Sequence, residues 1–537
     1  MIKNGHQDVL SRRQWALVAL CLVAFGLRLP PLWADRFHPD EALYASWGLL
    51  IRTGRDVWLS SQAADKPPVA FYLMALSFNY VWRCEAAARL PGLLAGTLCV
   101  PLGFQVSGSR FKDVAWVTAA LVAFSPYMIA FSPTAFLDPL MVAFALAAWA
   151  AAGRGRAFLA GILLGLSAAT KLTGLLFLPL VGFQIATRAP LRNGLSQLAN
   201  RKFGSGLVVV LALVLIWDRV KGGTPFWVQQ AINYEGARLV PLAEALPRLQ
   251  AWLSFFPYFF GRPALVAFAI IAVVQLVLCV LRFTFYACPR GEAKRVSRFT
   301  LHVSSLSRQA WLPWLGFGLF YLAVHCLLAF QLWDRYLLGL VPVAALLAAH
   351  ITARFVSGFT FYIIPSLPRD VSRFTPYIIP SLPRDVSRFM SSRACRGTFY
   401  VLLLILLLPP ALTAAGSGYP VGGDHGAYDG IEGVADYLRA RPEGTVVYDH
   451  WLGWEFRYYL WDAPVYVAHF PEPGWLRDDL RLWGQSAPRY VTVPAYVSAD
   501  PVLEAVAQAG FGASPVLATI SRRGQPTFTV YEIIPGK

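Results

Sequence analysis

The chain contains little charge for its length. Only 14% of its 537 residues are Asp, Glu, Lys or Arg, whereas 56% are apolar. Soluble globular proteins carry about 25% charged residues, so this composition excludes an ordinary soluble enzyme. The solvent that fits such a chain is a lipid bilayer. The 18 Trp, 22 Tyr and 36 Phe agree with this interpretation, because amphipathic aromatic rings accumulate at membrane interfaces.

Cysteine is also scarce. The sequence has seven cysteines, an odd number, and no CxxC pair. No cluster of His and Cys has the spacing of metal ligands. Four cysteines fall inside apolar stretches, where we expect core residues: Cys21, Cys99, Cys279 and Cys326. None follows Cys395, so disulfides do not hold the C-terminal region together.

Long apolar stretches are abundant. A helix needs about 20 apolar residues to cross the hydrocarbon core, and about eleven windows approach this length, with thirteen as the upper limit. They centre on residues 15–33, 89–106, 114–132, 138–152, 157–170, 172–187, 206–220, 262–281, 311–330, 335–352 and 399–415. The first window lacks a small-residue cleavage site, so we interpret it as a retained helix rather than a signal peptide. The segment 69–81 is too short to span, and we predict that it lies along the membrane surface.

The distribution of Lys and Arg predicts the orientation of the chain. These residues accumulate in cytoplasmic loops. With the N-terminus inside, the inner segments carry 24 of them and the outer loops about half as many. We therefore predict a protein of the cytoplasmic (inner or plasma) membrane, with its N-terminus inside and, after eleven spans, its C-terminus outside. The net charge of +17 lies in short runs between spans, so we expect contacts with anionic membrane lipids and none with nucleic acid.

The composition changes after residue 415 to Gly, Pro and charged residues. Strand and helix patterns alternate there: TVVYD, VYVAH and RYVTV as strands, and 431–438 and 475–483 as amphipathic helices. Asp500 and Pro501 should open a further helix as N-cap and first-turn residue, and Gly510 should close it. We therefore divide the chain into a transmembrane catalytic domain, residues 1–415, and a small extracytoplasmic α/β domain, residues 416–537.

One inner loop contains an internal repeat. The 15 residues FTFYIIPSLPRDVSR at 359–373 recur almost unchanged at 374–388. Two copies are too few for a solenoid. A tolerated local duplication is the simplest interpretation, and a basic, partly apolar surface that touches anionic lipid is the alternative.

Ionisable side chains occur at the ends of several spans. Seven candidates map to the predicted outer face: Asp40, Glu41, Lys66, Asp138, Lys171, Arg335 and Tyr336. Two adjacent carboxylates at the mouth of a membrane are costly without a partner or a purpose, and a lysine is a compact cation suited to a phosphate oxygen. The alternatives are a solvated loop for Asp40 and Glu41, a helix N-cap for Asp138 and a snorkelling side chain for Lys171. Together the seven residues predict an outer pocket in which cations hold a phosphate and a carboxylate accepts a proton.

The order of these residues resembles that of the GT-C glycosyltransferases, in particular the branch of protein O-mannosyltransferases and lipid A aminoarabinose transferases. The matching segments are DEALYA at 40–45, DKPP at 65–68, RLP at 89–91, LDP at 137–139, TK at 170–171 and RYLL at 335–338. The resemblance covers roughly residues 15–415. Leu43 stands where the aminoarabinose branch has an arginine, and the extra luminal domain of the O-mannosyltransferases is absent, so neither acceptor carries over.

The resemblance implies a hexosyl- or pentosyltransferase that moves a sugar, with inversion, from a polyprenyl-phosphate donor to a lipid, glycan or protein acceptor. The expected catalytic residues are Asp40 as base, with Glu41 and Asp138 beside it. The expected phosphate-binding residues are Lys66, Lys171, Arg335 and Tyr336. A divalent cation, Mg²⁺ or Mn²⁺, is left open as a cofactor. The rivals are a transporter or lipid flippase, which would place ionisable residues within its spans, and a scaffold whose outer domain is the functional part.

Overall fold

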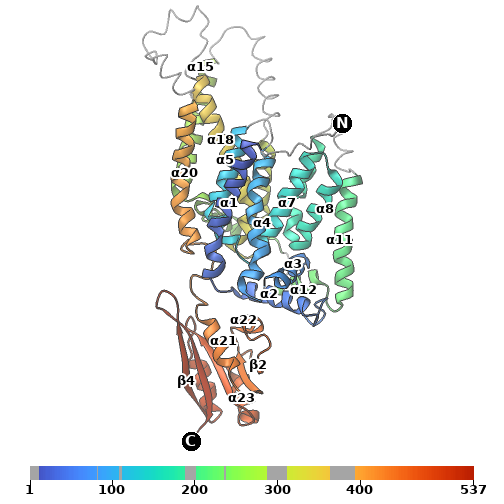
Figure 1. The fold of residues 1–537 in the computed structure, drawn as a ribbon, viewed down its shortest axis with the longest axis vertical. Coiled ribbons are helices and arrows are strands. Elements are labelled where there is room, and N and C mark those ends of the chain that lie inside the picture. Colours follow the sequence, from blue (N-terminus) through green and yellow to red (C-terminus); the bar gives the residue numbers. More distant parts are fainter. Residues whose placement is uncertain are drawn as a thin grey trace, which may run out of the picture.

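The structure is a computed structural model. It describes residues 11–81, 83–107, 112–187, 201–234, 238–286, 311–362 and 393–536. Figure 1 shows a bundle of helices and, below it, a smaller part that contains the sheet of the molecule. Apart from its first four residues, which end a helix, the internal repeat lies outside the described residues.

The bundle is built from helices, most of which overlap the apolar windows. In chain order they are α1 (Arg12–Ala34), α2 (Pro39–Arg52), α3 (Val69–Tyr80), α4 (Glu85–Val106), α5 (Lys112–Phe124), α6 (Pro126–Phe131), α7 (Asp138–Gly153), α8 (Ala157–Thr170), η1 (Leu172–Phe177), α9 (Leu178–Ala186), α11 (Arg201–Lys221), α12 (Phe226–Asn233), α13 (Leu242–Leu253), α14 (Pro257–Phe260), α15 (Arg262–Tyr286), α17 (Leu312–Leu327), η3 (Asp334–Leu340), α18 (Val341–Tyr362) and α20 (Arg393–Ala415). Each of the eleven windows overlaps one of these helices or two consecutive ones.

The length and composition of these helices identify an integral membrane protein. Among the described residues, five helical segments can each cross a bilayer: α1, α4, α11, the unit of η3 and α18, and α20. The number rises to six if the segment 242–260 and α15, which meet at a bend of 101°, form one broken span. The remaining windows hold apolar helices of 10–17 residues. The count of eleven spans therefore stays a prediction.

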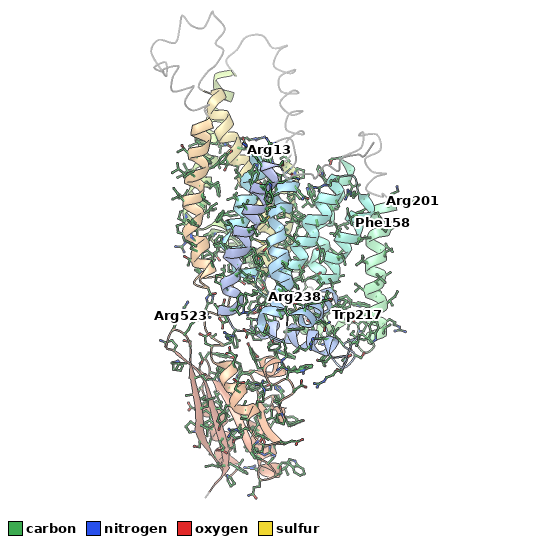
Figure 2. The ribbon with its side chains drawn as sticks, in the orientation of Figure 1. Arg13, Phe158, Arg201, Trp217, Arg238 and Arg523 are labelled. Carbon is green, nitrogen blue, oxygen red and sulfur yellow. The ribbon has the colours of Figure 1, made fainter. Side chains whose placement is uncertain are left out.

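The two ends of the bundle carry different residues. Arg13, Phe158 and Arg201, near the starts of α1, α8 and α11, lie at the upper end in Figure 2. Trp217 and Arg238 lie at the lower end, which faces the C-terminal part. Arg13 and Arg201, both assigned to inner segments, thus share one end. Which side of a membrane this end faces stays a prediction.

Short helices close the lower end of the bundle. Figure 1 shows α2, α3 and α12 there. Helix α3 forms at the segment predicted to lie on the membrane surface, and it packs against α2 and α4. Its Phe71, Met74 and Phe78 are buried. This helix is therefore largely covered by protein.

Two apolar segments contain a 3₁₀ helix next to an α-helix, and both 3₁₀ regions carry polar side chains. Helix α8 ends at Thr170, and Lys171 is extended (φ −153°, ψ 130°) before η1 begins. A Cβ at Gly174 would lie 2.5 Å from Ser167 Oγ, so only glycine allows η1 to fold back so closely onto α8. The second break is η3, which precedes α18 and contains Arg335. Neither segment is therefore a plain spanning helix.

The C-terminal part is a sheet with helices. Its elements are α21 (Ile431–Arg439), β1 (Thr445–Asp449), α22 (Gly453–Tyr459), β2 (Val465–His469), α23 (Pro473–Trp483), β3 (Arg489–Pro494), α24 (Asp500–Gln508), β4 (Phe511–Ile520) and β5 (Pro526–Pro535). The strand order is β2-β1-β3-β5-β4. Strand β1 is parallel to β2 and β3, whereas β5 is antiparallel to β3 and β4. The segments TVVYD, VYVAH and RYVTV lie in β1, β2 and β3.

The start of α24 differs by one residue from the prediction. The N-cap is Ala499, and Asp500 is the first helical residue rather than the cap. The hydroxyl of Ser498 accepts a hydrogen bond from the Asp500 amide at 3.2 Å, so a residue upstream of Asp500 supplies the oxygen that a cap usually provides.

The C-terminal part is fastened to the lower end of the bundle. Helix α22 packs against α2. The Phe37 ring contacts the Tyr458 ring with centroids 4.8 Å apart. Arg522, in the turn between β4 and β5, pairs with three carboxylates, those of Asp35 at 2.8 Å, Asp424 at 2.9 Å and Asp429 at 3.2 Å. These contacts hold the sheet against the end of α1 and the start of α2.

Candidate active site at the lower end of the bundle

A small cavity at the lower end collects most of the predicted site residues. Its lining includes five of them, and they come from four separate segments of the chain: Lys66, Asp138, Lys171, Arg335 and Tyr336. Tyr44, Phe136, Leu137 and Tyr234 complete the lining. Three cations therefore meet in one enclosed space, beside an aromatic wall.

Asp40 joins this group through Arg335. It lies in the first turn of α2, and its Oδ2 accepts a hydrogen bond from Arg335 Nη2 at 2.6 Å. The Arg335 guanidinium also lies over the Phe136 ring, 4.4 Å from its centroid. The Asp40 side chain is about a third exposed, whereas that of Arg335 is buried. Asp40 thus stands at the edge of the cavity, with one carboxylate that solvent or a substrate can reach.

Asp138 and Lys171 form a buried pair. Helix α7 begins at Asp138, and its N-cap is Leu137, without a side-chain cap bond. Asp138 therefore does not cap its helix. Its Oδ1 instead accepts from Lys171 Nζ at 2.7 Å. Lys171 Nζ also lies 4.1 Å from the centre of the Tyr336 ring, so this side chain points into the cavity rather than extending to the interface.

Lys66 is held by an acid and a tyrosine. Its Nζ donates to Asp65 Oδ2 at 2.5 Å and to the Tyr234 hydroxyl at 3.2 Å. The same carboxylate oxygen accepts from Asn233 Nδ2 at 3.2 Å. Burial raises the pKa of Tyr234 to about 12, so its hydroxyl stays protonated at neutral pH. Because Tyr234 belongs to a connection between helices, with no motif around it, the sequence gives no signal of its role.

Glu41 lies outside the cavity lining and is fully engaged elsewhere. Its two oxygens accept from Arg89 Nε and Nη2, each at 3.0 Å, and from the amides of His38 at 3.1 Å and Ala135 at 2.7 Å. The Arg89 side chain is only 2% exposed and also donates to the Asp35 and Arg36 carbonyls. This pair joins the start of α2 to α4 and to the residues before α7. It fixes the backbone on which Asp40 stands.

The backbone around Arg335 is also fixed by neighbouring groups. Asp334 Oδ1 accepts from the Arg335 amide at 2.8 Å, and Asp334 Oδ2 accepts from the Gly422 amide at 3.3 Å. Tyr127 donates its hydroxyl proton to the Asp334 carbonyl, and Tyr321 donates to the Tyr336 carbonyl at 2.7 Å. Hydrogen bonds from α6, from α17 and from the segment between α20 and α21 therefore orient η3.

His38 contributes to the start of α2 in its neutral form. Burial lowers the pKa of this histidine below its usual value of 6.5. Its Nδ1 accepts from the Asp40 amide at 3.2 Å and so caps the helix. Its ring packs edge-on against Phe136, with centroids 5.4 Å apart. This histidine therefore positions Asp40.

The arrangement suits the binding of a phosphate next to a proton acceptor. Cations and a buried hydroxyl in a low-dielectric cavity stabilise negative charge strongly. Among the described residues, no group of three or more His, Cys, Asp and Glu side chains could hold a metal ion. Asp40 and Asp138 each already pair with a cation of the chain.

The fold and the site define a polytopic membrane protein with a charged cavity at one end of its helical bundle. Residues 65–217 match the family model described as dolichyl-phosphate-mannose-protein mannosyltransferase. This segment contains Lys66, Asp138 and Lys171. No curated protein sequence matches the chain.

Two solved structures share the fold over nearly the whole chain. The first is ArnT from Cupriavidus metallidurans in the apo state, with a TM-score of 0.58 and 15% identity, covering 97% of this chain and 98% of that one. The second is the same protein bound to undecaprenyl phosphate, with a TM-score of 0.54, 16% identity and the same coverage. The family match and the shared fold confirm the resemblance to the GT-C glycosyltransferases and to their mannosyltransferase and ArnT branch.

Proposed function

We propose that this protein is a membrane glycosyltransferase that moves a sugar from a polyprenyl-phosphate donor to an acceptor at the outer face of the cytoplasmic membrane. The observation that carries the proposal is the meeting of Lys66, Lys171 and Arg335 in one cavity, with Asp40 at its edge. The ArnT structure with undecaprenyl phosphate supports a donor of this class.

The donor phosphate belongs among the cations of the cavity. The bond between the anomeric carbon and the phosphate oxygen breaks, and the polyprenyl phosphate that leaves carries the negative charge. Lys66, Lys171 and Arg335 lie where they can bind its oxygens, and the Tyr336 hydroxyl can donate to it. A phosphate that takes Arg335 competes with Asp40 for the same guanidinium. Binding of the donor therefore releases the carboxylate that accepts the proton of the acceptor hydroxyl.

Asp40 is the proposed base. It accepts the proton of the acceptor hydroxyl while the oxygen of that hydroxyl bonds to the anomeric carbon from the side opposite the leaving phosphate. This geometry gives inversion. Asp138 keeps Lys171 in the cavity through its ion pair, and Glu41 positions Asp40 through Arg89. Asp40 and Asp138 are already paired with cations of the chain, so they do not suit a metal ion.

The location of the charges favours transfer over transport. The cavity residues gather at one end of the bundle, whereas transporters place their binding sites near the middle of the membrane. Arg28 of α1 is buried and lies further from the lower end of the bundle. Its guanidinium donates hydrogen bonds to the Ala24, Val122 and Ala123 carbonyls and to Ser132. Its hydrogen bonds are satisfied by protein, so its role is in packing.

The proposal is tested with a strain that lacks this gene. Mass spectrometry of its polyprenyl lipids should show an accumulated polyprenyl-phosphate sugar, together with the loss of that sugar from an envelope lipid, glycan or protein. The accumulated lipid names the sugar, and the missing product names the acceptor. The wild-type chain should reverse both changes, and Asp40→Asn should reverse neither. Polyprenyl lipids and envelope glycans identical to those of the parent strain would contradict the proposal.

A further inference from the structure

A second cavity, of about 310 Å³, lies where the C-terminal part meets the bundle. One wall is formed by the end of α1 and the start of α4, and the other by α21 and α22. Figure 1 shows the lower ends of α1 and α4 facing these two helices. No residue of its lining belongs to the lining of the active-site cavity. The proposed glycosyl transfer makes no use of it.

The cavity lies beside the lipid-facing surface of α1. Trp33, which lines it, is 60% exposed. Leu22, also exposed, precedes Trp33 by eleven residues, which is about three helical turns. The two side chains therefore lie on one apolar face of a helix that can span the membrane. A tryptophan at the end of such a face marks the interface where lipid headgroups lie.

The charged side chains that line this cavity are positive and negative in equal number. It contains three arginines and three acids: Arg36, Arg83, Arg439, Glu85, Glu432 and Asp436. Arg36 pairs with Glu85 at 2.8 Å and with Glu432 at 2.7 Å, and Arg439 pairs with Asp436 at 2.7 Å. A ligand with one sign of charge would leave some of these side chains without partners, at a cost in free energy. A ligand that carries both a positive and a negative group would offer partners to both kinds of side chain.

Arg83 has the loosest ion pair of the three arginines, and Asp436 is the most exposed of the three acids. Arg83 Nη1 is 4.0 Å from Asp462 and donates to the Trp461 carbonyl at 3.4 Å, both at the limit of contact. Its side chain is 35% exposed, and that of Asp436 is 73% exposed. The planar guanidinium suits a phosphate, and the carboxylate suits an ammonium group.

We propose that this cavity binds the headgroup of a zwitterionic phospholipid, with the phosphate at Arg83, the ammonium group at Asp436 and the acyl chains along α1. The lipid comes from the leaflet that adjoins the C-terminal part. It ties α21 to the bundle at a point where protein contacts alone leave a gap.

The test uses the purified full-length chain and two lipids with identical acyl chains, palmitoyl-oleoyl phosphatidylethanolamine and palmitoyl-oleoyl phosphatidylglycerol. Native mass spectrometry measures how much of each stays bound. Wild-type protein should retain the ethanolamine lipid in preference to the anionic lipid. Arg83→Ala and Asp436→Asn should each weaken its binding by about tenfold, as expected for a lost hydrogen bond to a charged group. Both side chains are too exposed for these changes to prevent folding.

Arg477→Ala is the matched control. Arg477 lies in the same part of the chain, is 34% exposed and pairs with a neighbouring acid, but it does not line the cavity. Its replacement should leave lipid retention unchanged. Equal retention of the two lipids by the wild-type chain would overturn the proposal. So would wild-type retention in both variants, or an affinity for soluble glycerophosphoethanolamine equal to that for the lipid.

Discussion

Arg335 donates a hydrogen bond to Asp40 at 2.6 Å across a sequence separation of 295 residues. The pair joins the start of α2 to η3, so the proposed base and a proposed phosphate ligand are each other's partner before substrate arrives. A donor phosphate that binds Arg335 therefore changes the state of Asp40 as well. In the proposed reaction, this one contact links the charge of the leaving group to proton transfer at the acceptor.

Replacing Asp40 with Asn tests the base. The amide keeps the size of the side chain and can still meet Arg335, but it cannot accept a proton at neutral pH. We expect the variant to fold, to bind the polyprenyl-phosphate sugar and to lose turnover by about 10²–10⁴-fold. The measurement is sugar transfer in liposomes, with donor binding assayed separately. Wild-type turnover in this variant would remove Asp40 from the mechanism and direct attention to Asp138.

Alanine at Lys66 or Arg335 tests the phosphate site. Each change removes one charge-assisted contact from a buried cavity, and donor affinity should fall by about 2–5 kcal/mol. Lys66→Arg should restore only part of the donor affinity, because a planar guanidinium does not occupy the site of a compact ammonium group in the same way. Arg52→Ala is the control, since Arg52 is an exposed arginine at the end of α2. Equal donor affinity in Lys66→Ala and Arg52→Ala would place the phosphate elsewhere.

The Asp138 and Lys171 pair is open to a double-mutant cycle. Asp138→Asn leaves the Lys171 ammonium, whose side chain is 11% exposed, without its carboxylate, and the free energy of unfolding should fall by roughly 3–5 kcal/mol. Adding Lys171→Met to this variant should recover part of the loss, with a coupling of about 0.5–3 kcal/mol. Stability is measured by denaturant unfolding in detergent micelles. Strictly additive effects would show that the two side chains do not interact.

Glu455 predicts a pH dependence of stability. It lies in α22, is fully buried, and neither of its carboxylate oxygens has a hydrogen-bond partner. Burial, with the charges of Asp449 and Asp40, raises the pKa of Glu455 from 4.5 to about 8. The folded protein therefore keeps this proton between about pH 4.5 and 8 while the unfolded chain releases it. Stability should fall as the pH rises through this range, at roughly 1.4 kcal/mol for each pKa unit.

The check is thermal unfolding of the wild-type chain and of Glu455→Gln across this pH range. The amide cannot ionise, so its profile should lack this decline. Glu472→Gln, at an exposed position before α23, should keep the wild-type profile. Parallel profiles for wild type and Glu455→Gln would contradict the assignment.

Much of the site was accessible from the sequence because its residues stand at the ends of apolar runs. Asp40, Lys66, Asp138, Lys171 and Arg335 could be placed on one side by counting spans, and the structure brings them together. Their pairing could not be predicted. Asp40 and Glu41 are neighbouring acids, and the sequence does not distinguish their roles. In the structure Glu41 pairs with Arg89, whereas Asp40 pairs with Arg335. Only the ion pairs with Arg89 of α4 and Arg335 of η3 distinguish the two carboxylates.

In the C-terminal part too, the sequence predicts some strands and not others. Strands β1 and β3 are buried and rich in valine, which gives them a clear strand pattern. Strand β4 contains Gly512 and Pro515 and lies at the edge of the sheet. Proline and glycine are tolerated at an edge because one side of the strand needs no partner. The sequence therefore carries little sign of this strand.

The contact of Arg522 with Asp35, Asp424 and Asp429 has a consequence for biosynthesis. Asp35 directly follows α1, whereas Arg522 is translated nearly 490 residues later. We expect that, until that arginine is synthesised, the carboxylates of Asp35 and Asp424 lack the cation they share, so the C-terminal part is not yet fastened to the end of α1. Closure of the junction is thus one of the last events in the maturation of the chain. We therefore expect a truncation before Arg522 to yield a protein whose helices are inserted but whose C-terminal part is not fastened to the bundle.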